Sequence, residues 1–365
     1  MSILTYKIKH NKDFSLELVK AIKVAKFAIK TKSRSSKDVK HIGLKSMIAN
    51  QILKKYSGSK TCKSIHSVKL TINGYFVKID KEEQIINIPS LKLELNYLFP
   101  NNFTKINQVE VDNKYMYVSV SVEDKNEIKV KDYIGVDRNT TGHCAVVGIP
   151  STGKVHKLGK KAFHTHRKYK KIRKHLQSKN AKKKLKKISK REKHIIKDIN
   201  HKISRKIVNI ALENKCGIKL EDLKGIRKSK GGRNNKKNKS GESFKSSINT
   251  WEFYQLQSLI EYKSKICGIP LVYVDPKYTS QKCSMCGTIG NRNKKKFSCP
   301  HCGHVDHADT NAAFNIAKTA KTALVSLKNS ENSLSNDQSV VDRDATERST
   351  DARHLETQQG LCLVA

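Results

Sequence analysis

The sequence predicts an α/β protein with an N-terminal β-barrel that carries a helical insertion and a C-terminal mixed α/β domain. Three observations predict this fold class. Apolar and polar residues alternate from about 67 to 123, strand and helix patterns alternate from 133 to 327, and two Cys-x-x-Cys pairs interrupt the second region. The length of 365 residues suits about two or three domains at roughly 150 residues each. We expect the boundary near residue 130.

The N-terminal part, 1–130, is expected to hold a small antiparallel barrel or sheet with two helices inserted at about 14–57. Residues 14–30 place apolar side chains on one face at helical spacing, and residues 37–56 repeat this pattern before a Ser-Gly-Ser break. Six segments with alternating apolar and polar residues then predict strands: SVKLTIN, YFVKID, QIINIP, LKLELNYL, KINQVEVD and KYMYVSVSVE.

The C-terminal part, 131–327, is expected to alternate strands and helices. Its predicted strands are YIGVDR, HCAVVGI, VHKL, GIKLEDL and PLVYVD. The predicted helices are a very long one at about 161–214 and shorter ones at 251–267 and 311–327. A three-strand meander, a crossover helix and further strand–helix units describe a ribonuclease H-like layout. Residues 328–365 hold four basic and seven acidic residues among many polar ones, which predicts a disordered tail.

Positive charge dominates the chain. The 74 Lys and Arg residues face 32 Asp and Glu residues, so the formal net charge is +42. Residues 151–206 hold 23 basic residues against Glu192 and Asp198, and residues 224–239 hold eight basic residues and no acid. Because contacts with phosphates relieve such self-repulsion and release counterions, nucleic acid is the expected partner. A solvated helix face and a surface loop are the competing explanation.

Membrane association is not expected. No apolar stretch approaches the ~18 residues of a membrane span, and the first residues, MSILTYKIKHNKDF, lack the apolar core of a signal peptide. Anionic lipid is a weaker partner than nucleic acid, because no exposed apolar helix face or lipidation motif accompanies the basic runs. We therefore expect a cytoplasmic, nucleoid-associated protein.

Four of the nine cysteines form a metal-ligand pattern, C-x2-C-x12-C-x2-C. The four are Cys283, Cys286, Cys299 and Cys302. Each pair can place two thiolates on one tight turn, and two such turns enclose Zn²⁺ in a tetrahedron, so the pattern predicts a structural zinc ribbon at 278–304. A disulfide pair is the alternative, which the lack of a secretory signal disfavours. Three nearby histidines are competing ligands: His301, His304 and His307.

Three acids stand at the ends of predicted elements. Asp137 ends the strand YIGVD, Glu221 ends the strand IKLED, and Asp309 precedes the last helix. In a ribonuclease H-like layout the first and fourth strands are neighbours, so Asp137 and Glu221 meet at one end of the sheet, where Asp309 can approach from the helix. Three converging carboxylates repel one another unless cations bind between them, and such hard oxygen ligands suit Mg²⁺ or Mn²⁺.

Each acid also has an ordinary structural explanation, as a turn residue, a surface ion pair or a helix N-cap. The coincidence of three acids at matching element ends, beside a zinc ribbon, favours a metal-dependent nuclease that cleaves phosphodiesters with two metal ions. Spacing alone leaves competitors for Glu221 and for the third acid: Asp222 in the first case, Asp275 and Asp306 in the second.

Four stretches resemble the TnpB family, also called OrfB, which insertion sequences encode and which is related to type V CRISPR effectors. They are IGVDRN at 134–139, IKLEDLKGI at 218–226, DPKYTSQKCSMCG at 275–287 and FSCPHCGHVDHADTNAAFNIA at 297–317. The last two are the most specific, because Y-T-S-Q-x-C-x-x-C-G followed by D-x-N-A-A-x-N-I is an unusual conjunction. The N-terminal 130 residues match only in general layout, a wedge-like barrel with a helical insertion.

The resemblance implies a transposon-encoded, RNA-guided DNA endonuclease with a RuvC-like nuclease domain of ribonuclease H fold. It implies Asp137, Glu221 and Asp309 as the catalytic, magnesium-binding acids, which favours Glu221 over Asp222 and Asp309 over Asp306. The implied partners are a DNA target and a guide RNA derived from the end of the element. The implied cofactors are structural Zn²⁺ and catalytic Mg²⁺ or Mn²⁺.

Two other functions compete with this interpretation. One is a nuclease-inactive protein that uses RNA to occupy DNA, which the presence of all three acids disfavours. The other is a DNA transposase or recombinase that acts without guide RNA, since proteins of this kind are commonly described as transposases. The basic long helix, 161–206, and the N-terminal half are expected to hold the RNA and the RNA–DNA duplex.

Overall fold

The computed structural model describes the whole chain except residues 60, 61, 63, 140, 224–252 and 320–365. The basic loop at 224–241, the predicted tail at 328–365 and the end of the last predicted helix lie outside the described residues. The described chain forms two compact units, 1–124 and 125–319. Among the described helices, none combines the length and the apolar character needed to cross a bilayer.

The first unit is built on two antiparallel sheets. The larger sheet has the strand order β1-β7-β6-β2, and the smaller one has the order β3-β4-β5. The strands are β1 Ser2–Lys9, β2 Leu70–Asn73, β3 Lys78–Asp80, β4 Ile85–Ile88, β5 Leu93–Asn96, β6 Phe103–Val111 and β7 Tyr115–Val122. Alternation of apolar and polar residues aims one side chain in two at a shared core, as the sequence predicts.

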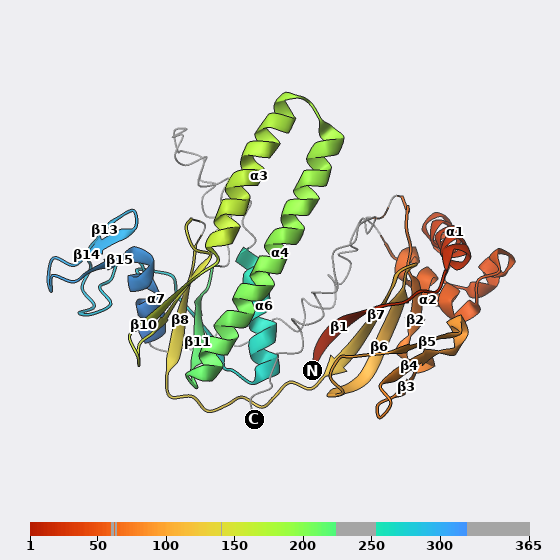
Figure 1. Ribbon diagram of the computed structural model, residues 1–365, viewed down its shortest axis with the longest axis horizontal. Coiled ribbons are helices and arrows are strands. Elements are labelled where there is room, and N and C mark those ends of the chain that lie inside the picture. Colours follow the sequence, from red (N-terminus) through yellow and green to blue (C-terminus); the bar gives the residue numbers. More distant parts are fainter. Residues whose placement is uncertain (60–61, 63, 140, 224–252, 320–365) are drawn as a thin grey trace. The chain divides into compact units, whose positions relative to one another are not determined.

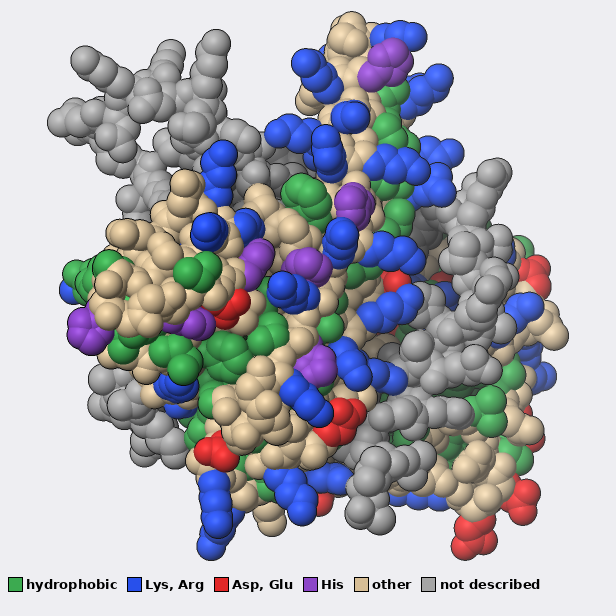
Figure 2. Space-filling view, turned by 60° about the vertical axis from the view of Figure 1, so that its left-hand side comes forward, with side chains coloured by type: hydrophobic (Ala, Val, Ile, Leu, Met, Phe, Trp, Pro, Cys, Tyr) green, Lys and Arg blue, Asp and Glu red, His purple; other side chains and the backbone are tan. Residues whose placement is uncertain are grey.

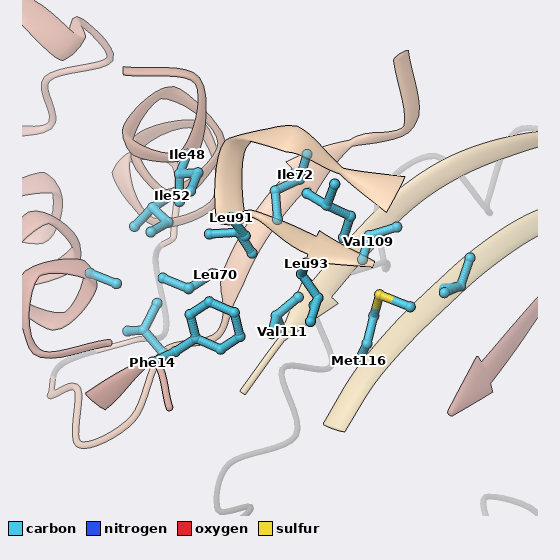
Figure 3. Packing of buried hydrophobic residues seen from close by; sticks show 14 of the residues in the cluster. Phe14, Ile48, Ile52, Leu70, Ile72, Leu91, Leu93, Val109, Val111 and Met116 are labelled. Carbon is cyan, nitrogen blue, oxygen red and sulfur yellow. The ribbon is translucent and has the colours of Figure 1, made fainter. Parts of the chain in front are cut away.

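Two α-helices and a 3-10 helix lie between β1 and β2 in the sequence. They are α1 Ser15–Thr31, η1 Ser36–Ile42 and α2 Ser46–Ser57. Figure 3 shows Ile48 and Ile52 of α2 on the side of the core that also holds Leu70, and the same core includes Val109 of β6. The helices therefore close the core on one side.

Two features of this unit were not predicted from the sequence. β1 was not predicted, although its burial alternates strictly and it pairs with β7 along its whole length. The second predicted helix, 37–56, is wrong as one element, because Gly43 takes a left-handed conformation with φ of 70° and ends the 3-10 helix before α2 begins.

The second unit contains a five-stranded sheet with the order β10-β9-β8-β11-β12. Its strands are β8 Tyr133–Arg138, β9 Ala145–Ile149, β10 Lys154–Leu158, β11 Gly217–Glu221 and β12 Leu271–Val274. The first three form an antiparallel meander, and β11 pairs in parallel with both β8 and β12. The chain order of strands across the sheet is therefore 3-2-1-4-5, with the first and fourth strands adjacent.

Helices cover both faces of this sheet (Figure 1). α7, Ala308–Lys318, packs on the face that carries Gly135 of β8, while α4, Lys182–Glu213, and α6, Phe253–Cys267, lie on the other side. α7 begins at Ala308, three residues earlier than predicted, because His307 caps it.

The predicted single long helix at 161–214 is wrong, because the structure forms two helices. α3, Lys160–Ser178, and α4, Lys182–Glu213, pack against each other as a hairpin (Figure 1). Asn180 adopts a left-handed conformation with φ of 47° in the connection. Asn tolerates this conformation better than most residues, so a continuous helical pattern in the sequence concealed a tight turn.

Candidate active site and metal centre

Two of the three predicted acids stand side by side at one end of the five-stranded sheet. The parallel ladder of β8 and β11 pairs Val136 with Leu220, so the next residues, Asp137 and Glu221, follow at neighbouring strand ends. Arg138 points to the opposite face and donates a 2.6 Å hydrogen bond to the backbone oxygen of Glu221. This bond holds the ends of the two strands together and fixes the spacing of the two carboxylates.

The third acid, Asp309, reaches the same place from α7. It lies in the first turn of that helix, not before it as predicted, and only 1% of its surface is exposed. Asp137 and Glu221 are also buried, with 8% and 9% exposed. The three acids that the sequence singled out are therefore brought together, although they are 84 and 88 residues apart in the chain.

Burial and neighbouring charge act on the pKa of the two strand-end acids. Burial, followed by the charges of Glu221 and Asp309, raises the pKa of Asp137 from 3.8 to about 7, against a 2.7 Å hydrogen bond from Asn139. Burial also raises the pKa of Glu221, although the Thr279 hydroxyl donates a 2.5 Å hydrogen bond to it. The end of the sheet is therefore a site of concentrated negative charge.

Two basic side chains balance Asp309. Lys295 Nζ lies 2.5 Å from its Oδ2, and an Arg292 nitrogen lies 3.4 Å from its Oδ1. Both residues come from the hairpin of β13, Asn291–Asn293, and β14, Lys296–Ser298. Neither residue was predicted from the sequence, because a single basic residue carries little signal in a chain with 74 Lys and Arg.

The competing acids play other parts. Asp222 follows the end of β11 and its amide donates to Val274, while Asp275 accepts a 2.9 Å hydrogen bond from the Lys277 amide as a turn residue. Asp306 accepts a hydrogen bond from the His307 amide. The negative charges that raise the pKa of Asp137 belong to Glu221 and Asp309, not to these three acids.

The carboxylates have the donor chemistry that hard divalent cations prefer, since all offer oxygen. Their oxygens are less tightly grouped than a closed metal site requires. Within the described part of the chain, only the four cysteines place all their ligand atoms within 4.8 Å of one another. A divalent ion at the carboxylates therefore fits the ligand type and the charge, and it competes with Lys295 for Asp309.

The cysteine cluster has the spacing of a tetrahedral metal site. The Sγ atoms of Cys283 and Cys302 are 3.6 Å apart, and those of Cys286 and Cys299 are 3.5 Å apart. Zinc–sulfur bonds of about 2.3 Å in a tetrahedron separate the sulfurs by roughly 3.8 Å. All four thiols are free, so the disulfide alternative is wrong for them.

Local structure around the cysteines supports metal binding. Hydrogen bonds from the side chain and backbone of Thr288 lower the pKa of Cys286 to about 5, which favours the thiolate that binds metal. Gly287 and Gly303 follow the two pairs with φ of 79° and 69°, and this left-handed turn needs glycine. The cluster is compatible with structural zinc.

The cysteine segment is tied directly to α7. Asn311 accepts a 2.8 Å hydrogen bond from the Ser284 amide and donates one of 2.7 Å to the Lys282 carbonyl. Lys318 donates to the Ser284 carbonyl at 2.6 Å. Because α7 also carries Asp309, the cysteine centre and the carboxylate site share one supporting helix.

The α3–α4 hairpin forms a basic arm. Figure 2 shows Lys and Arg side chains along its length. The exposed basic residues of the two helices are Lys160, Lys161, Arg167, Lys168, Lys170, Lys171, Lys174, Lys182, Lys183, Lys184, Lys186, Lys187, Arg191, Lys193, Lys197, Lys202 and Lys206. A surface of one sign on a protein of net charge +42 suits a polyanion.

A comparison with protein families matches the model described as Cas12f1-like, TNB domain, over residues 253–316. The match covers α6, β12, the cysteine segment and most of α7. A search of curated proteins finds the TnpB-like protein MJ0751 of Methanocaldococcus jannaschii, 31% identical over 243 residues, which are 66% of this chain and 76% of that protein.

Cas12f proteins are also similar. The CRISPR-associated endodeoxyribonuclease Cas12f1 of Sulfoacidibacillus thermotolerans is 40% identical over 122 residues, which are 32% of this chain and 26% of that protein. Among solved structures, a chain of a Cas12f1–sgRNA–target DNA complex matches with a TM-score of 0.43 at 17% identity, covering 87% of this chain and 99% of that one. The chain thus spans most of its archaeal relative but about a quarter of this Cas12f1.

Proposed function

The chain belongs to the TnpB family, and on this premise we propose that it is an RNA-guided DNA endonuclease. The observation that carries the proposal is the convergence of Asp137, Glu221 and Asp309 at one buried sheet end. Relatives named endodeoxyribonucleases support the reaction class. The proposed substrate is the phosphodiester backbone of a DNA target.

Asp137, Glu221 and Asp309 are the proposed ligands of Mg²⁺ or Mn²⁺ and the proposed catalytic residues. Two such ions about 3.5–4 Å apart activate a water molecule and stabilise the leaving oxygen of a phosphodiester. The Arg138 bond to the Glu221 carbonyl keeps the two strand ends in register, and Asn139 orients Asp137. Arg292 and Lys295 bring positive charge to the rim, which suits an anionic substrate.

We assign 131–327 to a RuvC-like nuclease domain of ribonuclease H fold, interrupted by a zinc ribbon at 278–304. The strand order 3-2-1-4-5 supports this assignment. Cys283, Cys286, Cys299 and Cys302 would hold the zinc, whose four thiolate ligands leave no open position for a substrate. Residues 1–130 would form the wedge domain. Its helical insertion would consist of α1, η1 and α2.

The basic arm is the proposed site for RNA and for the RNA–DNA duplex. In such a system the protein reads the A-form shape and the backbone, and base pairing reads the sequence. A guide RNA derived from the end of a transposable element is the proposed partner, and transposition is the proposed biological setting. The lysine-rich surface of α3 and α4 supports backbone contact, because its charges need no base sequence.

The decisive test begins with RNA that co-purifies with the protein when its flanking element is present. A bound RNA of defined sequence would be sequenced and used to design a matching DNA, and cleavage would be measured in Mg²⁺. We expect Asp137→Ala to abolish cleavage and to keep RNA binding within about twofold, because the substitution removes a metal ligand and leaves the basic arm intact.

The outcomes separate the three functions. Cleavage by Asp137→Ala at the wild-type rate would refute the catalytic assignment. RNA binding without cleavage by the wild-type protein would identify the nuclease-inactive form, and cleavage or strand joining without any bound RNA would identify a conventional transposase. EDTA should stop cleavage under every metal-dependent mechanism, so it tests the chemistry alone.

A further inference from the structure

Lys219 is a buried lysine on the inner strand β11, two residues before Glu221 and therefore on the same face of the sheet. Only 6% of its surface is exposed. Its Nζ donates hydrogen bonds of 2.7 Å to the carbonyl oxygens of Ala317 and Thr319, at the C-terminal end of α7. The same ammonium group lies 4.8 Å from the centre of the Tyr133 ring. Lys219 thus links the C-terminal end of α7 to β11.

The other end of α7 carries Asp309, close to Asp137. Between the two ends, the helix backbone touches the strand backbone at Gly135, where an added Cβ would lie 2.0 Å from the Ala313 oxygen and 2.5 Å from the Ala317 nitrogen. α7 therefore runs antiparallel to β8 in direct contact with it. No long side chain separates the two backbones at this contact. A movement of the helix along its axis would therefore shift Asp309 by the same distance.

We propose that Lys219 is a positioning residue that fixes α7 along its axis and thereby sets the distance of Asp309 from Asp137 and Glu221. The inference rests on the proposed function, in which these three carboxylates bind divalent ions. Lys219 would contribute to metal binding without being a ligand itself, because it contacts the end of α7 that is far from Asp309.

The physical basis lies in the helix end. The last carbonyls of a helix have no intrahelical donor, and a cation there also complements the helix dipole, so an ammonium group can anchor that end strongly. A slip of one residue along the axis moves a helix by about 1.5 Å. A misplacement of about 1 Å at reacting groups can lower a rate about 10²-fold. A loosened α7 would therefore weaken the metal site before it unfolds the protein.

A second buried lysine supplies a matched control. Lys263 of α6 is 2% exposed, and its Nζ donates hydrogen bonds of 2.7 Å to the His201 carbonyl and to the Ser204 hydroxyl of α4. It has the same chemistry as Lys219, with two short hydrogen bonds in a buried contact between elements. It joins α6 to α4, on the opposite side of the sheet from α7.

The experiment titrates Mn²⁺ into the full-length, zinc-loaded protein and measures binding by calorimetry and by the electron paramagnetic resonance signal of free Mn²⁺. The variants are Lys219→Met, Lys263→Met and Asp137→Ala, the last of which defines the binding that depends on the carboxylate site. Melting temperatures are recorded for all variants. We expect Lys219→Met to weaken that binding about tenfold or more, in the range seen when residues that orient metal ligands are removed.

Lys263→Met should keep the Mn²⁺ affinity within about twofold, even where its melting temperature falls as far as that of Lys219→Met. Equal affinities for wild type and Lys219→Met, or equal losses in both lysine variants, would overturn the positioning role. If wild type and Asp137→Ala bind Mn²⁺ alike, the carboxylate site and the proposal fail together. Should Lys219→Met not fold, Lys219→Gln, which keeps one donor, is judged by the same criteria.

Discussion

At the scale of single residues, Asp137 has an unusually high pKa for an aspartic acid. Its pKa is raised from 3.8 to about 7 by burial and by the charges of Glu221 and Asp309. Between these two values the folded protein binds a proton that the unfolded chain has released. The free energy of unfolding therefore falls as the pH rises through this window, and the penalty is fully present above about pH 7.

Replacing Asp137 with Asn tests this directly in the absence of divalent ions. We expect Asp137→Asn to gain stability relative to wild type as the pH rises from 4 to 8, by up to roughly 4 kcal/mol, because each pKa unit corresponds to about 1.36 kcal/mol. Urea unfolding at several pH values measures the difference. Adding Mg²⁺ should reverse the order at pH 8. A stability difference that does not change with pH would contradict the raised pKa.

The residues of the site differed in how far the sequence could predict them. The positions of acids at element ends predicted a cluster of carboxylates, but the resemblance to the TnpB family was needed to choose Glu221 over Asp222 and Asp309 over Asp306. The cysteine cluster was predictable because zinc imposes a spacing on its ligands. Lys295, Arg292 and Lys219 were not, since nothing in a basic chain marks which lysine faces a carboxylate or a helix end. Their roles depend on contacts between segments remote in sequence.

At the scale of elements, the basic arm poses an electrostatic problem, because α3 and α4 carry like charges and lie side by side. Glu192 of α4 is buried between them, where it contacts His166 Nδ1 at 2.9 Å and pairs with Arg173 of α3. One carboxylate thus joins two helices that otherwise repel each other. The arm can keep its shape while its outer faces stay basic.

Glu192→Gln should therefore lower the free energy of unfolding by about 1.5–3 kcal/mol, the range for hydrogen bonds to a charged group. Asp198→Asn is the matched control in the same helix, because Asp198 forms an exposed pair with Lys202, worth about 0.3–0.5 kcal/mol. Chemical denaturation measures stability, and hydrogen exchange locates the loosened helices. A loss no greater for Glu192→Gln than for Asp198→Asn would show that the pair does not hold the arm together.

The elements also show the limits of sequence patterns. Strands and helices with strong periodicity were predicted well, as for α1, whose bounds lie within one residue of the prediction. Two failures came where a single residue with positive φ interrupts a continuous pattern, at Gly43 and at Asn180. The unpredicted strand β1 is a separate case, because its pairing with β7 joins segments remote in sequence. The two helices of the hairpin have the same basic, amphipathic character, so only the tertiary contact between them reveals the turn.

At the scale of the whole molecule, each unit has its own support. The first unit rests on an apolar core that spans both of its sheets and the inserted helices. The end of the second unit has a much smaller cluster, made of Cys283, Cys299, Phe297 and Ala308. With so little apolar burial, this segment would take its order from the proposed zinc, as small zinc modules do.

Removing zinc should therefore loosen one region of the molecule selectively. We expect a chelator, or Cys286→Ser, to speed hydrogen exchange at least tenfold in 279–318, because Asn311 and Lys318 lose the ordered loop they bind. Exchange in β6 and β7 should stay unchanged, since the core of the first unit contains none of these residues. Because Asp309 lies in the loosened helix, Mn²⁺ binding at the carboxylates should weaken in parallel. Unchanged exchange in α7 would show that the cysteine centre does not support the carboxylate site.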